Sequence, residues 1–293
     1  MPPVVAHHFT DPGCPWAYSF RPACARLRWR FGDQVEWRLV TIGLSETTER
    51  ALRAGRTPAS QVIGWRIFAR RFGMPFTLEP KPRLAATSRA CRAIVAAREL
   101  DPALGERAFR ELQLLHFTTT ALLDDDGDLR DRLARIPGLD AAALVGRIDD
   151  PELIRLYEAD RALARSAEGS PTDVQERAST SDGPVRYTAP SVIFEHAEGR
   201  RLEVGGFQPF EAYDTALANL DVALERRPPP GAVGAALAAF PDGLTTAEVA
   251  SVMRASDLVD ADLDATEAQL LTLAGEGGAT FEDELWRVEN SVD

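Results

Sequence analysis

The chain has 293 residues, 45% of them hydrophobic and 27% charged, a composition that supports a substantial core and excludes a disordered chain. Its formal net charge of -12 argues against general affinity for nucleic acid or for anionic membrane surfaces. No apolar run reaches the roughly 18 residues of a membrane span, and the first residues lack the basic and apolar regions of a secretion signal. Three cysteines form no disulfide framework, so we expect a cytoplasmic protein. The length exceeds that of one typical domain, so we expect two structural units or one domain with a large insertion.

The N-terminal part, residues 1–56, has the pattern of a β-α-β unit. A short β-branched run predicts a strand over Val4–Phe9, and a helical pattern follows over Pro15–Phe31, with Pro22 bending it. A second strand is predicted over Val35–Leu44. A helical crossover of this kind makes the two strands parallel neighbours.

The next part, residues 57–178, contains helical patterns and no strand pattern. Short breakers rich in glycine, proline and aspartate separate the helices. The predicted helices are Ala59–Phe72, Leu84–Leu100, Leu104–Thr119, Leu129–Arg135, Ala141–Ile148 and Pro151–Ala167. We expect an all-helical insertion.

Strand patterns return in residues 179–226. Pro190–His196 and Arg201–Gly205 flank a short turn and predict a hairpin, and a helix is predicted over Pro209–Leu224. Without the insertion, the order is β-α-β followed by β-β-α, which is the order of the thioredoxin fold. The predicted fold class is therefore α/β, a thioredoxin fold interrupted by a large helical insertion.

Residues 227–293 are predicted to form a separate C-terminal module after a stiff proline linker. Helical patterns cover Ala232–Phe240, Thr246–Ala255 and Ala265–Leu273, and a turn with a strand follows over Gly275–Trp286. This order suggests a winged-helix-like module in which Thr245 or Thr246 caps the second helix. Residues 228–293 hold 13 acidic and 2 basic side chains. A DNA-reading module needs the opposite sign, so we interpret it as a packing or protein-contact unit.

The segment DPGCPWAYS, Asp11–Ser19, places Cys14 between the end of the first strand and the start of the first helix. The unpaired N–H groups and the positive dipole end of a helix favour thiolate over thiol. Pro15 suits the first helical turn, where its missing N–H has no cost. The sequence therefore predicts that Cys14 is a reactive thiol with a lowered pKa. The third residue after it is Ala17, so only half of a Cys-x-x-Cys motif is present.

This segment resembles the active-site segment of the DsbA family in the thioredoxin superfamily, and within it the FrnE-like branch. That branch is similar to 2-hydroxychromene-2-carboxylate isomerases and kappa-class glutathione transferases. Two further matches are Tyr187–Phe194 and Gly206–Gln208, and the resemblance spans residues 3–226. It implies that Cys14 is the catalytic residue and that Pro190 is a cis proline beside it.

Four residues are predicted to bind substrate around that thiol. A cis bond at Pro190 would expose the backbone of Ala189 as a template for an extended peptide or a thiol ligand. Trp16 is expected to form a wall that contacts substrate, next to Pro15.

Two residues are candidate accessories. Asp11 is expected to be a turn residue whose charge raises the pKa of the thiol, with proton relay as the alternative. Cys91 lies in a Thr-x-x-Ala-Cys-Arg stretch, where the family has histidine in place of the cysteine, on the helix that in the family caps the active-site cleft. It either resolves Cys14 or is a buried helix residue. Cys24 is predicted to be a core residue.

Three functions are compatible with these residues. Ala17 cannot break a mixed disulfide, so the leading hypothesis is thiol–disulfide exchange completed by an external thiol such as glutathione or mycothiol. The alternatives are a thiol-dependent isomerase or transferase and a non-catalytic module that binds an extended peptide.

We expect a small thiol or a protein disulfide as the partner and no tightly bound cofactor. A metal site is not expected, because the adjacent His7 and His8 have no third ligand nearby. The oligomeric state is left open, a homodimer being one option.

Overall fold

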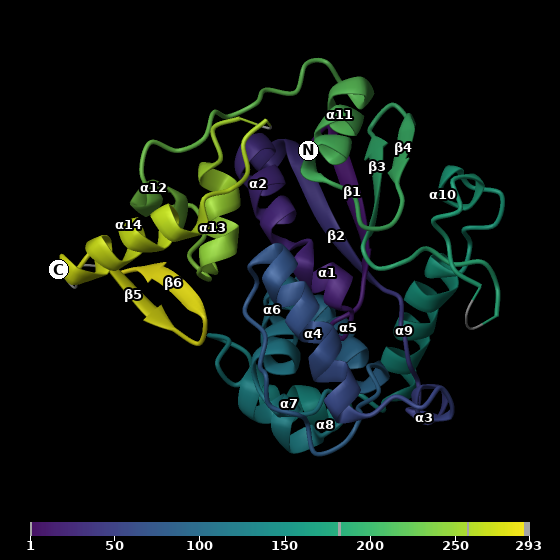
Figure 1. Ribbon diagram of the computed structural model, residues 1–293. Coiled ribbons are helices and arrows are strands. Elements are labelled where there is room, and N and C mark those ends of the chain that lie inside the picture. Colours follow the sequence, from purple (N-terminus) through teal and green to yellow (C-terminus); the bar gives the residue numbers. More distant parts are fainter. Residues whose placement is uncertain (1, 181–182, 257, 290–293) are drawn as a thin grey trace.

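The computed structural model describes residues 2–180, 183–256 and 258–289. Its central sheet has the order β2-β1-β3-β4, formed by β1 (Val4–Thr10), β2 (Val35–Thr41), β3 (Ser191–His196) and β4 (Arg201–Val204) (Figure 1). β2 is parallel to β1, whereas β3 is antiparallel to both β1 and β4. The predicted crossover and the predicted hairpin are both confirmed.

One face of the sheet is covered by α2 (Arg21–Phe31) and α11 (Phe210–Leu220), whose apolar side chains share a core with the strands. The predicted single helix is two helices. The short α1 (Pro15–Ser19) ends at Phe20, and α2 begins with Pro22 in its first turn. The missing N–H of Pro22 is tolerated at a helix start, so one helix ends there and a second begins, and no single bent helix is formed.

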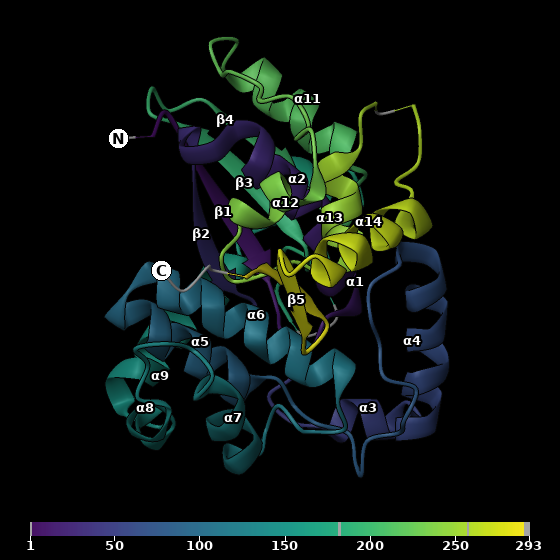
Figure 2. The same cartoon turned by 90° about the vertical axis from the view of Figure 1, so that its left-hand side faces the viewer.

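The helical insertion lies beside β2 (Figure 2), mainly through α9, with smaller contributions from α5 and α6. Its hydrophobic core also includes Leu39 of β2. The insertion comprises α4 (Pro58–Phe72), α5 (Ser88–Leu100), α6 (Pro102–Thr118), α7 (Asp126–Leu133), α8 (Ala141–Arg147) and α9 (Pro151–Ala164). Two short helices, α3 (Glu49–Arg53) and α10 (Pro171–Val174), were not expected. The predicted α/β class, a thioredoxin fold with a helical insertion, is confirmed.

The C-terminal module contains α12 (Val233–Ala238), α13 (Thr246–Met253), α14 (Leu263–Gly275) and a hairpin of β5 (Ala279–Glu282) and β6 (Leu285–Val288). Thr245 caps α13, and its side chain accepts from the Glu248 N–H while the Glu248 carboxylate accepts from the Thr245 N–H, as in a capping box. The expected element order is therefore present, while the winged-helix-like description remains a prediction.

The module is not held apart by its linker. It packs on α2, and its core includes Ala25 and Trp29 of that helix. The indole N–H of Trp29 donates to the carbonyl of Pro228 at 2.8 Å, and the Arg227 guanidinium lies 4.8 Å from the Trp29 ring centroid. These contacts hold the predicted proline linker on α2.

A buried carboxylate joins all three parts of the chain. Glu248 of α13 accepts two hydrogen bonds of 2.8 Å from Arg110 of α6 and one of 3.1 Å from Arg21 of α2. Burial by itself would raise the pKa of Glu248, but Arg110, Arg21 and the Thr245 N–H together hold that pKa at about 2. The module is thus anchored to the insertion and to the thioredoxin fold through one ionised side chain.

Candidate active site

Cys14 lies where β1 gives way to α1, as the N-cap residue of that helix. Its Sγ donates a hydrogen bond of 3.2 Å to the carbonyl of Ala189, and the Ala189–Pro190 peptide bond is cis. The cis bond predicted from the sequence is confirmed. The fold thus brings together Cys14, Ala189 and Pro190 from opposite ends of the thioredoxin unit.

The predicted lowering of the Cys14 pKa is wrong. The residue is only 7% exposed, and burial raises its pKa to about 12. The backbone N–H groups of Ala17 and Trp16 act in the opposite direction, and the charge of Asp11 adds to the increase. The five-residue α1 supplies a small field, whereas the side chains packed around the sulfur exclude water. The free protein therefore holds a neutral thiol.

We expect the alkylation rate of Cys14 by iodoacetamide to increase about tenfold per pH unit from pH 7 to beyond pH 10, because only the thiolate reacts and a pKa above its ordinary value delays deprotonation. The rate would be measured in a C24S/C91S variant, so that Cys14 is the one thiol that can be alkylated. The same variant in denaturant is the control, and its rate should level off above about pH 8.5. A plateau below pH 9 in the folded protein would contradict the buried, neutral thiol.

Asp11 organises the turn that presents Cys14. It is fully buried and accepts from the N–H of Gly13 at 2.9 Å, the N–H of Leu44 at 2.8 Å and the hydroxyl of Thr87 at 3.0 Å. Burial raises its pKa, and these hydrogen bonds oppose that increase. Asp11 is thus the turn residue that the sequence predicts, and it fastens the turn to the end of β2 and to the start of α5.

Cys91 is completely buried in α5, and its Sγ lies 3.5 Å from the Asp11 carboxylate. Burial and the nearby Asp11 charge raise its pKa well above the ordinary value. Cys14, Cys24 and Cys91 are all free thiols. Of the two readings of Cys91, the structure matches the buried helix residue. Cys24 lies 8% exposed in the core under the sheet, as expected.

Trp16 forms part of an aromatic wall beside the thiol. It is 39% exposed, and its ring packs edge-on to Phe68 and Phe72 of α4, with centroid separations of 4.8 and 6.0 Å, and against Phe207 at 5.2 Å. A large exposed aromatic side chain held by three others is well placed to contact an apolar part of a ligand. Its substrate contact remains a prediction.

A cleft of about 810 Å³ opens next to the Cys14 turn, between the segment after β2, α4 and the start of α5. Gly13, Pro15 and Trp16 line it on the side of the thiol. The remainder of the lining includes four arginines, Arg50, Arg56, Arg161 and Arg186. Among the described lining residues, Glu46 is the single carboxylate. Glu46 already accepts from the hydroxyl of Tyr157 at 2.5 Å. Arg161 is ion-paired with Glu46 at 3.4 Å and with Glu158 at 2.8 Å, so the exposed Arg50 and Arg56 supply the positive charge that favours an anionic ligand.

His116 of α6 also lines this cleft, a role that was not predicted. It is 3% exposed, and its Nδ1 has no hydrogen-bond partner among the described residues. Burial and the charge of Lys81 keep its pKa well below the ordinary value, so the imidazole is neutral. His116 and the four arginines are brought to the cleft by the packing of separate elements. No local sequence motif could have predicted that they line it.

The fold defines a thioredoxin-superfamily protein, with a cysteine at the start of the first helix opposite a cis proline. The family described as DSBA-like thioredoxin domain matches residues 7–174, and the chain belongs to this family. The resemblance stated from the sequence is thereby confirmed. Members of the family are thiol–disulfide oxidoreductases.

Two solved structures show the same fold. The cytosolic disulfide reductase DsbM from Pseudomonas aeruginosa is 19% identical with a TM-score of 0.52, and the match covers 74% of this chain and 100% of that one. A probable DsbA oxidoreductase from Streptomyces coelicolor is 19% identical with a TM-score of 0.55, covering 74% of this chain and 89% of that one. A sequence search of curated proteins found no match. Within the described ranges, no helix has the length and apolar character needed to cross a membrane.

Proposed function

We propose that this protein is a thiol–disulfide oxidoreductase that works with the single cysteine Cys14 and an external small thiol. The observation that supports this best is the position of the Cys14 Sγ, 3.2 Å from the Ala189 carbonyl and beside Pro190. An extended disulfide substrate would meet the thiol and the Ala189 backbone together. Ala17 occupies the position of the missing second cysteine, so resolution falls to a thiol from solution.

The reaction consists of two exchanges. Cys14 loses its proton to solvent, and its thiolate attacks one sulfur of a mixed disulfide, forming a new S–S bond and releasing the other partner as a thiolate that takes up a proton. An external thiolate then attacks the substrate sulfur of the adduct, which joins the external thiol to that sulfur in a new disulfide and returns Cys14. Overall one S–S bond is broken and one is formed: the first partner leaves as a free thiol, and one external thiol is consumed. Because the pKa of Cys14 is about 12, we expect a slow reaction at neutral pH that accelerates with increasing pH.

The charge of the cleft favours an acidic co-substrate. Arg50 and Arg56 are exposed on its rim, and Arg161 and Arg186 lie further along its lining. Guanidinium groups bind carboxylates through paired hydrogen bonds. Glutathione carries such carboxylates, so it suits this lining as the small thiol. The cytoplasm, where such thiols are abundant, remains the expected location.

Glutathione disulfide tests the proposal directly. The full chain, incubated with it at pH 9, should gain one glutathione adduct by intact-mass spectrometry, with Cys14 as the modified residue. The C14S variant should gain none, while C24S, which removes a buried thiol outside the site, should behave like the wild type. Absence of the adduct on wild-type protein at pH 9 and pH 10 would overturn the proposal.

A second candidate is a thiol-dependent isomerase or transferase, favoured by the neutral Cys14 thiol that donates a hydrogen bond. Such a donor can hold the sulfur of a bound thiol conjugate without any redox change. The C14S variant separates the two functions, since serine also donates a hydrogen bond but cannot form a disulfide. Retained turnover in C14S would indicate the isomerase or transferase. For a non-catalytic peptide-binding module, C14S would leave peptide capture intact without any turnover.

A further inference from the structure

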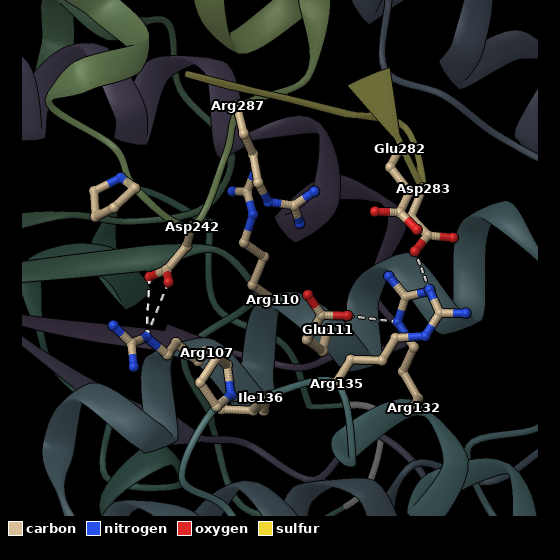
Figure 3. Close-up of a pocket in the computed structure, with 12 residues that line it drawn as sticks. Arg107, Arg110, Glu111, Arg132, Arg135, Ile136, Asp242, Glu282, Asp283 and Arg287 are labelled. Carbon is tan, nitrogen blue, oxygen red and sulfur yellow. Dashed lines mark hydrogen bonds and ion pairs between the residues drawn. The ribbon is translucent and has the colours of Figure 1, made fainter. Parts of the chain in front are cut away.

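A second pocket, of about 570 Å³, lies in the seam between the helical insertion and the C-terminal module (Figure 3). It shares no lining residue with the cleft beside Cys14. Its walls come from α6, the region of α7, the segment before α13 and the β5–β6 hairpin. Five arginines line it: Arg107, Arg110, Arg132, Arg135 and Arg287.

Three of these arginines are neutralised by carboxylates that also line the pocket. The pairs are Arg107 with Asp242 at 3.0 Å, Arg132 with Glu111 at 2.5 Å, and Arg135 with Asp283 (Figure 3). The first and third of these pairs connect the insertion to the module across the seam. The fourth lining carboxylate, Glu282, has no ion pair within the described part of the chain, so this part of the pocket carries no surplus positive charge.

The remaining two arginines meet at Gly243. Arg110 donates to the carbonyl of Gly243 at 2.7 Å, and a Cβ added to Gly243 would lie 3.2 Å from the Arg287 Nε. Arg110 shares the single carboxylate of Glu248 with Arg21. No ion pair of Arg287 is found within the described part of the chain. Of the two arginines that line this end, Arg110 thus shares its counter-charge with Arg21, and Arg287 adds a positive charge that no described carboxylate pairs.

An unpaired donor is buried at the same place. Arg110 is 7% exposed, and its Nε has no hydrogen-bond partner among the described residues. A buried donor without a partner has a free-energy cost that a ligand oxygen would remove. The charge surplus and the unused donor therefore indicate the same kind of ligand, an oxyanion.

We propose that this pocket binds the phosphoryl group of a small phosphomonoester through Arg110 and Arg287. A dianion suits these two guanidinium groups: Arg287 can form paired hydrogen bonds with phosphate oxygens, and the Nε of Arg110 supplies a further donor. The volume leaves room for an organic group beyond the phosphoryl group. The carboxylate of Glu282, which has no ion pair among the described residues, lines the rest of the pocket and would repel a second anionic group, which disfavours polyphosphates.

Inorganic phosphate is the probe for the first test, titrated into the full chain by calorimetry at pH 8, with ionic strength held constant by chloride. We expect saturable binding at one site per chain. The R287Q variant should bind about tenfold more weakly, because it loses one charge-assisted contact. The R38Q variant is the matched control: Arg38 is an exposed residue of β2 that does not line the pocket, and it should bind like the wild type.

Lowering the pH distinguishes binding of the phosphate dianion from a general effect of pH on the charge of the protein. Phosphate binding should weaken between pH 8 and pH 5.5, because phosphate gains a proton over that range. Sulfate stays doubly charged and should bind equally at both pH values. Absence of saturation, equal affinity in R287Q and wild type, or an equal loss of sulfate binding would overturn the proposal. None of these measurements uses thiol chemistry, so their outcome is independent of the function proposed for Cys14.

Discussion

Replacing Glu248 with glutamine should lower the free energy of unfolding by about 3 kcal/mol, because the guanidinium groups of Arg110 and Arg21 would lose their shared counter-charge while Arg110 stays buried. Glutamine keeps nearly the same shape, so the loss reports the charge and not a cavity. The measurement is urea unfolding at pH 7, with fluorescence and circular dichroism followed together.

The E49Q variant is the control for this substitution. Glu49 also pairs with an arginine, Arg53, but its side chain is 67% exposed. Exposed helix pairs contribute about 0.5 kcal/mol or less. If E248Q has no larger effect than E49Q, then Glu248 is not the anchor of the C-terminal module.

The pH dependence of stability gives an independent check on Glu248. Its pKa is lowered from an ordinary 4.5 to about 2, so the stabilisation it supplies is complete above pH 4.5 and is lost as the pH falls through 2. A shift of this size corresponds to about 3 kcal/mol. The difference in stability between wild type and E248Q should therefore shrink by about that amount between pH 5 and pH 2.

The second large effect is a gain of activity. Replacing Ala17 with cysteine should produce an internal disulfide with Cys14 and increase insulin reduction on the order of tenfold, because an internal thiol then resolves the mixed disulfide. Positions three apart in the first turn of a helix lie within the Cα separation that a disulfide spans. Ala17 is 1% exposed and packs in the same cluster as Cys14.

Insulin turbidity in the presence of an external reductant measures this gain, and a count of free thiols measures the new bond. The A23C variant adds a cysteine to α2, away from the site, and should show neither effect. An A17C protein with all four thiols free under mild oxidation would show that the α1 turn does not hold the two sulfurs in bonding geometry.

The fold could be predicted because its signals are local and repeated. The strand patterns around Val4, Val35, Ser191 and Arg201 and the helical periodicities between them give the element order, and that order defines the thioredoxin fold. The helices α3 and α10 are too short for a periodic signal. Pro22 indicated the right place for an irregularity, but the sequence did not show that the helix ends at Phe20 and a second helix begins there.

The chemistry of the site was predicted less completely than its position. Cys14 and Pro190 lie side by side, as their motifs indicate. The direction of the Cys14 pKa shift, however, depends on burial in a cluster with Phe9, Ile42 and Tyr187, which come from three separate segments of the chain. The same holds for Glu248, which contributes to an acidic composition in the sequence but is a paired interior charge in the fold. Composition gives the net charge of a segment, whereas the desolvation that shifts a pKa depends on which other segments pack against the ionisable group.

The attachment of the C-terminal module to α2 has a consequence for shortening the polypeptide. A version ending at Arg227 would leave Ala25 and Trp29 facing water and would remove the counter-ion of Arg21 and Arg110. Newly bared apolar surface of this kind promotes self-association. We therefore expect the thioredoxin part to depend for its solubility on module residues that do not contact the thiol.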